Sequence, residues 1–151
     1  MKFLELYNRL LKLPFGKFIF NKGVGFVAPF FGKIRPDIVE LNSSRCVVRM
    51  RDRRGVRNHI GTINAGAMCT LAELVGGMAV DASIPADLRW IPKGMTISYL
   101  AKAKGTLEAI CEVGGVEYEK GEIVVPVIIM NHVGRKVCSA EITFYISKKK
   151  T

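Results

Sequence analysis

The segment from Asn58 to Val80, NHIGTINAGAMCTLAELVGGMAV, constrains the fold more strongly than any other part of this 151-residue chain. From Asn64 onward the segment contains neither Lys nor Arg, and its one charged residue is Glu73. Large apolar residues recur there at helical spacing, at Leu71, Val75 and Met78. A helix that is apolar on almost every side is normally buried. The segment therefore predicts one central helix, over residues 64–80, enclosed by the rest of the chain.

Alternating and β-branched residues on both sides of this helix predict strands. Two candidate strands precede the helix and four follow Pro85, at residues 33–42, 45–53, 95–105, 105–115, 121–131 and 136–147. The turn NHVGR, which contains Gly134, joins the last two as a hairpin. Because the strands follow one another without alternating helices, we expect an antiparallel sheet in an α+β fold. A chain of this length suits one domain.

The first 30 residues predict a helical extension. Large apolar side chains form a helical stripe over residues 3–13, and a second helical piece is expected before Pro29. Packing of this extension against the domain or another subunit is the favoured interpretation. Contact with a membrane surface is the alternative, because Lys and Arg interrupt the apolar runs. No uninterrupted apolar run reaches the roughly eighteen residues that a membrane span requires.

The chain is strongly basic, with a formal net charge of +10 and a sequence pI of about 9.7. Such a charge favours anionic partners, namely nucleic acid, an acidic membrane surface or a phosphorylated ligand. Arg49, Arg51 and Arg53 are predicted to form a cationic row on one face of a strand, and three lysines stand in the C-terminal tail at residues 148–150. A solvated edge explains both runs equally well. Nucleic acid is not expected, because no aromatic residues interleave with the basic row.

The four cysteines do not form a metal-binding pattern. Cys46, Cys69, Cys111 and Cys138 are widely spaced, with no CxxC pair and no histidine near enough to complete a zinc site. We therefore expect no metal. The N-terminal segment lacks the features of a secretory signal, so free thiols in a reducing cytoplasm are the default expectation.

Glu73 is unexpected in so apolar a helix. It lies about 200° around the helix axis from Leu71, on the stripe of Gly66, Cys69 and Gly77, so we expect it to face a cleft or a partner chain. A carboxylate in apolar surroundings without a neighbouring cation is a candidate general base or nucleophile.

The start of the same helix offers a complementary group. The amides of Ala65 and Gly66 have no intrahelical acceptors and lie at the positive end of the helix dipole, where they can bind a developing oxyanion. Ala65 and Glu73 are about 12 Å apart along a helix, which is too far for both to reach one carbon atom. If both act, they come from different subunits, so the hypothesis requires at least a dimer.

The segment resembles the helix signature of the PaaI-like group of acyl-CoA thioesterases, which have the hotdog fold. That signature commonly reads N-x-x-G-T-x-H-G-G, followed by L-A-D or L-A-E. This chain has Asn58, Gly61–Thr62, NAG at 64–66 in place of HGG, and LAE at 71–73. The resemblance covers residues 31–147 and implies a curved antiparallel sheet wrapped around the central helix. We therefore expect a hotdog domain over residues 31–151, preceded by the extension of residues 1–30.

The resemblance implies hydrolysis of an acyl-CoA or related acyl thioester. It assigns Glu73 the role of general base or nucleophile, and it assigns oxyanion binding to the amide of Ala65, beside Gly66. Asn58 is expected to hold substrate or water, while Thr62 and Asn64 are expected to contact the substrate. Coenzyme A enters as part of the substrate, and no separate cofactor is implied. The resemblance also implies a homodimer, or a dimer of dimers, with sites shared between subunits.

Phosphates of coenzyme A require cationic partners. Arg57, Lys93 and Arg135 are the candidates in this chain, whereas neither His59 nor His132 is assigned a catalytic role. The competing hypothesis is a non-catalytic module that binds an acyl-CoA, a lipid or a membrane surface through the N-terminal extension and the basic face.

Overall fold

The computed structural model describes residues 3–149, so the last lysine of the predicted tail, Lys150, lies outside the described part. Two predicted strands, one long helix and four further strands follow the helical extension, which confirms the predicted order. The elements are α1 (Phe3–Leu10), α2 (Gly16–Val27), α3 (Pro29–Gly32), β1 (Asp37–Leu41), β2 (Arg45–Met50), the 3-10 turn η1 (Arg54–Val56), α4 (Ala65–Ser83), β3 (Leu88–Tyr99), β4 (Leu107–Glu112), β5 (Gly121–Asn131) and β6 (Lys136–Lys148).

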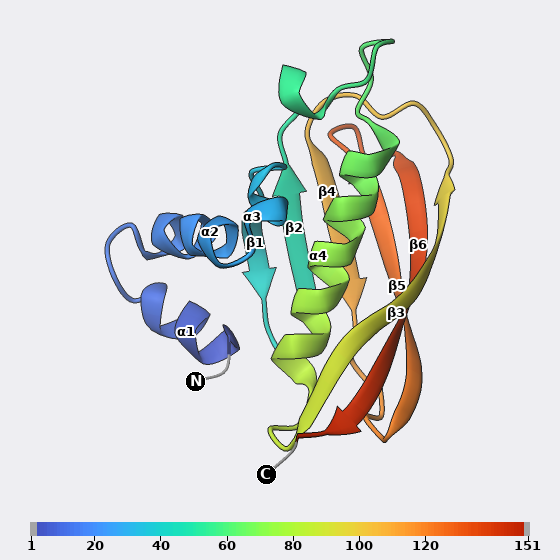
Figure 1. Cartoon of the computed structure of the whole chain (residues 1–151). Coiled ribbons are helices and arrows are strands. Elements are labelled where there is room, and N and C mark those ends of the chain that lie inside the picture. The colour runs from blue at the N-terminus through green and yellow to red at the C-terminus, as the bar shows by residue number, and fades with distance from the viewer. Residues whose placement is uncertain (1–2, 150–151) are drawn as a thin grey trace.

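The six strands form one antiparallel sheet in the order β1-β2-β4-β5-β6-β3. The sheet curves around α4, which runs along its concave side (Figure 1). The predicted α+β class and the expected hotdog arrangement are therefore confirmed. The two edges of the sheet are β1 and β3, and the outer edge of β3 has no partner strand among the described residues.

Small residues let α4 approach the sheet closely. A Cβ atom added to Gly76 would lie 2.6 Å from Cδ1 of Ile142 in β6, and one added to Gly77 would lie 3.0 Å from the ring of Trp90 in β3. This close packing offsets the roughly 1 kcal/mol by which each glycine disfavours a helix. By length and composition α4 could cross a membrane. However, 67% of its most apolar 18-residue stretch is buried inside the protein, which identifies it as a core helix.

The N-terminal extension packs against α4 and β1. Tyr7 of α1 and Phe20 of α2 are buried, with ring centroids 4.8 Å apart. The side chain of Asn21 donates a hydrogen bond to Asp37 at 2.8 Å and accepts one from the amide of Ile38 at 3.0 Å, which ties α2 to β1. Packing against the domain is therefore confirmed for the inner faces of α1 and α2.

The prediction that Arg49, Arg51 and Arg53 form a cationic row on one strand is wrong. Because β2 ends at Met50, Arg51 and Arg53 lie in the following loop and share no strand face with Arg49. The strand ends two residues before Asp52, and the carboxylate of Asp52 anchors the loop that follows by accepting two hydrogen bonds. The donors are Nε of Arg57 at 2.6 Å and the amide of Gly105 at 2.8 Å.

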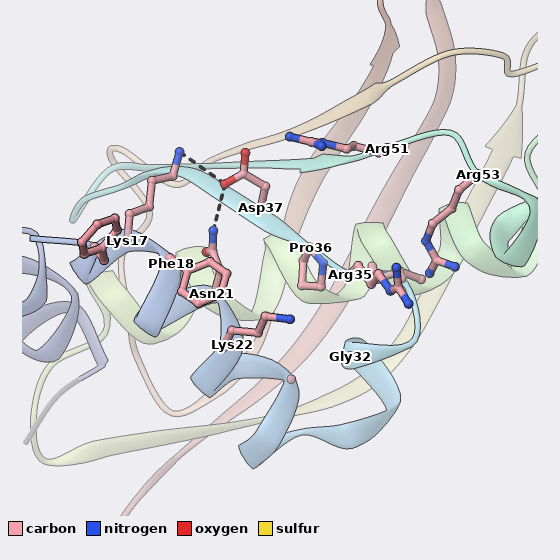
Figure 2. Close-up of a pocket in the computed structure, with 13 residues that line it drawn as sticks. Lys17, Phe18, Asn21, Lys22, Gly32, Arg35, Pro36, Asp37, Arg51 and Arg53 are labelled. Carbon is pink, nitrogen blue, oxygen red and sulfur yellow. Dashed lines mark hydrogen bonds and ion pairs between the residues drawn. The ribbon is translucent and has the colours of Figure 1, made fainter.

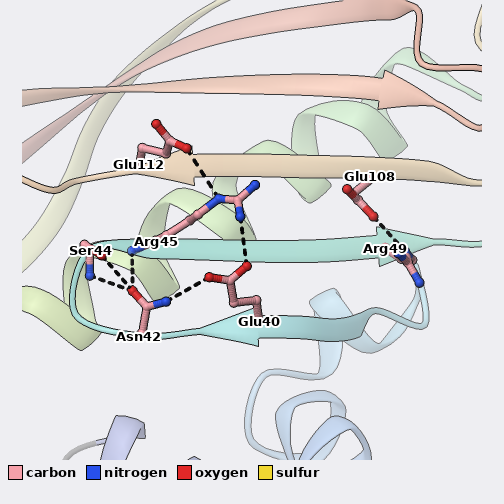
Figure 3. Close-up of polar contacts among 7 residues, drawn as sticks. All are labelled: Glu40, Asn42, Ser44, Arg45, Arg49, Glu108 and Glu112. Carbon is pink, nitrogen blue, oxygen red and sulfur yellow. Dashed lines mark hydrogen bonds and ion pairs between the residues drawn. The ribbon is translucent and has the colours of Figure 1, made fainter.

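The arginines that do lie on β2 are paired with carboxylates on the neighbouring strands (Figure 3). Nε of Arg49 lies 2.7 Å from Glu108 of β4. Arg45 lies 2.9 Å from Glu40 of β1 and 3.4 Å from Glu112 of β4. These pairs are partly exposed, so each contributes little to stability, but together they neutralise the charge of the strand.

β3 begins at residue 88 instead of the predicted 95 and ends at Tyr99. The early part contains Pro92, which cannot donate to a ladder and is tolerated because this is an edge strand. A register shift between Pro92 and Gly94 marks a bulge beside it. The hairpin turn between β5 and β6 is confirmed, with Gly134 at a φ of 75°.

Candidate active site

The loop that leads into α4 is organised by Asn58. Its side-chain Nδ2 donates to Oγ1 of Thr62 at 2.8 Å, and its Oδ1 accepts from the amides of Ile60 and Thr62, each at 3.1 Å. Gly61 makes the turn between them at a φ of 75°, and Thr62 is buried. Because the loop uses both polar atoms of the Asn58 side chain, this residue fixes the path of the chain into α4.

The first turn of α4 has one capped amide and one free amide. Oδ1 of Asn64 accepts from the amide of Gly66 at 2.7 Å, an N-cap that typically contributes about 1 kcal/mol. The amide of Ala65 has no acceptor within residues 3–149, and Ala65 is exposed. Of the two predicted oxyanion donors, Ala65 therefore presents its N–H to solvent at the positive end of the helix.

Glu73 lies two turns further along α4, on the partly exposed stripe that the spacing predicts. Within the described residues its carboxylate makes no hydrogen bond or ion pair, and it lines an apolar pocket of about 420 Å³. The extension contributes Val24 and Phe31 to the wall of this pocket, and β3 contributes Trp90 and Pro92. Glu73 is thus a partly buried, unpaired carboxylate in a cavity of the size that holds small ligands.

A second carboxylate at this pocket, Asp81, differs from Glu73 because it already has a partner. It accepts a hydrogen bond from Nε1 of Trp90 at 3.2 Å. The ring of Trp90 also packs edge-on against Phe144, with the centroids 5.1 Å apart. Asp81 therefore holds the pocket wall in place, and Glu73 is left as the carboxylate with free oxygens.

Cys69 lies between the free amide and Glu73 on the same helix. Burial raises the pKa of the Cys69 thiol, and the charge of Glu73 raises it further, so the thiol stays protonated at neutral pH and is a poor nucleophile. Burial also raises the pKa of Tyr99, whose hydroxyl donates to the carbonyl of Ala65 at 3.3 Å. These neighbours leave Glu73 as the candidate base or nucleophile on this stripe.

The three cations predicted to bind coenzyme A phosphates lie in different surroundings. Arg57 is paired with Asp52 at 2.6 Å, and Lys93 on β3 is paired with Glu122. Arg135 has no carboxylate partner among residues 3–149 and is exposed in the turn between β5 and β6. That turn lies at the end of the molecule where α4 begins (Figure 1). Arg135 is therefore the predicted cation that is free to bind an anion there.

The structure shows which predicted residues come together within one chain. The loop and helix start gather Asn58, Thr62, Asn64, Ala65 and Gly66, but Glu73 remains about 12 Å from Ala65 along the helix axis. Three residues at the site were not predicted from the sequence: Trp90 and Phe31, which line the pocket, and Tyr99, which bonds to Ala65. Trp90, the single tryptophan, gave the one available signal, because buried indole N–H groups usually have a hydrogen-bond partner.

The chain is similar to several solved structures. A solved structural-genomics protein, APC5556, is 39% identical with a TM-score of 0.88, over 97% of this chain and 99% of that one. PA5026 from Pseudomonas aeruginosa, a probable thioesterase, is 24% identical with a TM-score of 0.77, over 91% and 97%. A hypothetical thioesterase from Streptococcus pneumoniae, solved with coenzyme A, is 24% identical with a TM-score of 0.66, over 77% and 91%. No protein in a search of curated sequences matches significantly.

These likenesses confirm that the chain has the fold of the hotdog thioesterase superfamily, as its helix signature indicates. A family model described as "Domain of unknown function (DUF4442)" matches residues 16–146, from the start of α2 to near the end of β6. Because that match covers most of the sequence, the chain belongs to the DUF4442 family.

Proposed function

We propose that this protein hydrolyses an acyl-CoA or related acyl thioester at sites shared between two copies of the chain. The observation that carries the proposal is the unpaired carboxylate of Glu73 at an apolar pocket, on a helix whose first amide, that of Ala65, is also unpaired. A general base and an oxyanion donor are the two groups that acyl transfer to water requires. The thioesterase names of the structural neighbours support the same chemistry.

The chemistry follows from these two groups. A water molecule attacks the thioester carbonyl carbon while Glu73 takes a proton from that water. Negative charge develops on the carbonyl oxygen, where the amide of Ala65 stabilises it. The intermediate then expels the thiolate, which receives the proton from Glu73, so that the products are coenzyme A and a carboxylic acid, which releases its proton to solvent. Direct attack of Glu73 on the carbonyl, followed by hydrolysis of the anhydride, uses the same two residues.

Both groups can act on one carbonyl if two copies pair through β3. This strand is 12 residues long, and its outer edge carries unpaired backbone groups and the exposed side chain of Ile91. Soluble proteins rarely leave so long an edge unprotected, because it is a template for pairing with another strand. A two-fold axis at β3 creates two equivalent sites. We propose this dimer, alone or paired into a dimer of dimers, as the active form.

The pocket favours an uncharged acyl group. Apart from Glu73 and Asp81, its wall is formed by apolar side chains of the extension, α4 and β3. Two carboxylates repel a third, so an acyl group that ends in a carboxylate should bind poorly. Coenzyme A is the proposed carrier because it is present with one structural neighbour and because the exposed Arg135 suits a phosphate.

One observation favours the non-catalytic alternative, in which the protein binds an acyl-CoA or lipid without cleaving it. The helix begins with Asn64, whose side chain caps Gly66, where the thioesterase signature has histidine. A ligand that binds only the folded state raises the melting temperature whether or not it is cleaved. Thermal stabilisation by an acyl-CoA without release of thiol would therefore identify a binding module.

The test is thiol release from two matched substrates, butyryl-CoA and succinyl-CoA, which have the same number of acyl carbons and differ in a terminal carboxylate. We expect wild-type protein to release coenzyme A from butyryl-CoA at least about tenfold faster in kcat/KM, because the added charge meets Glu73 and Asp81. Longer aliphatic and aromatic acyl-CoAs complete the panel. Absence of thiol release from every member would refute the proposed hydrolysis. A preference for succinyl-CoA would refute only the proposed preference of the pocket for uncharged acyl groups.

A further inference from the structure

The outer face of α2 is apolar although it faces solvent. Phe18 is 61% exposed and Phe26 is 87% exposed, while the opposite face of the helix packs Phe20 into the core. Phe15, just before the helix, is 83% exposed and holds a φ of 61°, a conformation that costs a bulky residue about 1 kcal/mol or more. A helix at the surface of a soluble protein normally shows polar residues on this side. The exposed face of Phe15, Phe18, Ile19 and Phe26, here called the aromatic face, therefore requires a partner.

The charge around the aromatic face has one sign. Residues 6–36 contain no Asp or Glu, and their basic residues are Arg9, Lys12, Lys17, Lys22, Lys33 and Arg35. A second copy of the chain carries the same net charge of +10 and the same basic extension, so pairing two aromatic faces brings like charges together. The charge instead complements an anionic surface.

A cationic cavity of about 830 Å³ adjoins the aromatic face (Figure 2). Its wall includes Phe15 and Phe18 of that face together with Lys17, Lys22, Arg35, Arg51 and Arg53. Asp37, the carboxylate in this wall, is already engaged by Lys17 at 3.3 Å and by Asn21 at 2.8 Å. Arg53 donates to the carbonyl of Lys33.

Besides Arg53, whose partner is a neutral carbonyl, three cations of the cavity have no counter-charge. Lys22, Arg35 and Arg51 form no ion pair with any residue in the range 3–149, and no dashed line reaches them in Figure 2. The ammonium of Lys22 lies over the ring of Phe18, 5.5 Å from its centroid, a contact that leaves its charge uncompensated. Like charges around one cavity repel each other, and a group with several anionic oxygens removes that repulsion. A phosphate group is such a group, and Arg side chains bind it through paired hydrogen bonds.

We infer that α2 docks this protein onto an anionic phospholipid surface. The aromatic face enters the boundary between head groups and acyl chains, while the lysines around it meet the surface charge. The cationic cavity receives the phosphate of one lipid head group. The inner face of the same helix contributes Val24 to the pocket that contains Glu73, so docking places that pocket next to the bilayer. The inference does not depend on the proposed hydrolysis, because it concerns the opposite face of the helix.

The test is co-sedimentation of the full-length protein with vesicles of phosphatidylcholine, with or without phosphatidylglycerol. We expect binding to the anionic vesicles, little binding to phosphatidylcholine alone, and release at high salt. The double substitution Phe18→Ser with Phe26→Ser should weaken binding by about tenfold or more, because two buried rings are lost. Arg51→Gln, which has no partner to lose in the free protein, should weaken it by several-fold.

Two exposed residues provide matched controls. Val133→Ser removes an apolar side chain that is 71% exposed, far from α2 in the sequence, and Arg54→Gln removes a charge that does not line the cavity. Both control variants should bind like wild type. No binding to anionic vesicles, or equal losses in test and control variants, would overturn the inference. Binding of inorganic phosphate in calorimetry without vesicle binding would instead assign the cavity to a soluble ligand. Self-association lost in Phe26→Ser, again without vesicle binding, would assign the aromatic face to a second copy; either result overturns the inference.

Discussion

Glu73→Gln is expected to lower kcat for thiol release by between about a hundredfold and ten-thousandfold, the range that loss of a general base produces. The amide has nearly the same size as the carboxylate, so the pocket keeps its shape, but it cannot accept a proton from water. Glu73 makes no ion pair or hydrogen bond with the described residues, and the substitution therefore removes no structural contact. The rate is measured by continuous detection of free coenzyme A under saturating butyryl-CoA, with the melting temperature recorded for both proteins.

Asp81→Asn is the matched control for this substitution. Asp81 lines the same pocket from the same helix, and an asparagine oxygen can still accept the hydrogen bond from Trp90. We expect this variant to retain most of the wild-type activity on butyryl-CoA. Equal activity of Glu73→Gln and wild type would remove Glu73 from the mechanism. Equal losses in both variants would show that the general charge of the pocket, and not a base at Glu73, determines the rate.

Ala65→Pro should lower kcat by between about a hundredfold and a thousandfold, as loss of one oxyanion donor does in other acyl transfers. Proline removes the amide hydrogen of residue 65 and nothing else that the helix needs, because the first position of a helix favours proline. The preceding residue must be extended, and Asn64 already is, with φ of −65° and ψ of 140°. Circular dichroism and thermal melting should therefore match wild type while thiol release falls.

Ala65→Gly controls for the change in side chain, since it keeps the amide. We expect it to remain active. Its free energy of unfolding should fall by at most about 1 kcal/mol, which is the cost of glycine in a helix. If Ala65→Pro hydrolyses butyryl-CoA as fast as wild type, the oxyanion is held elsewhere. The next candidate donor would then be the amide of Gly66, which would first have to break its hydrogen bond to the side chain of Asn64.

The sequence was sufficient to predict the fold because local patterns agreed with the tertiary structure. The apolar run around Leu71, the two glycines Gly76 and Gly77, and the turn at Gly134 each correspond to a contact or dihedral angle in the structure. The prediction of a cationic row failed because the alternation continues past Met50 in the sequence, whereas β2 ends there and the hydrogen bonds of Asp52 hold the following residues in a loop. One of those bonds comes from Arg57, five residues away, and the other from Gly105, which is distant in sequence and which no local pattern could show.

The candidate site was only partly predictable for the same reason. Ala65 and Glu73 follow from helix periodicity and from a known signature, both of which lie within one element. The pocket wall comes instead from three distant segments, represented by Val24, Phe31 and Trp90, and their meeting depends on how the extension packs across α4. The aromatic face of α2 is likewise invisible in the sequence, because periodicity alone does not say which apolar side of a helix is buried.

Mixing the two inactive variants tests the shared site most directly. If each site combines Glu73 of one subunit with Ala65 of the other, a hybrid of Glu73→Gln and Ala65→Pro has one intact site and one doubly altered site. Random exchange of subunits makes half of the dimers hybrids, so activity on butyryl-CoA should recover to about a quarter of the wild-type value. Activity that stays at the average of the two separate variants, after exchange has been verified by mass spectrometry of the intact dimers, would contradict the shared site.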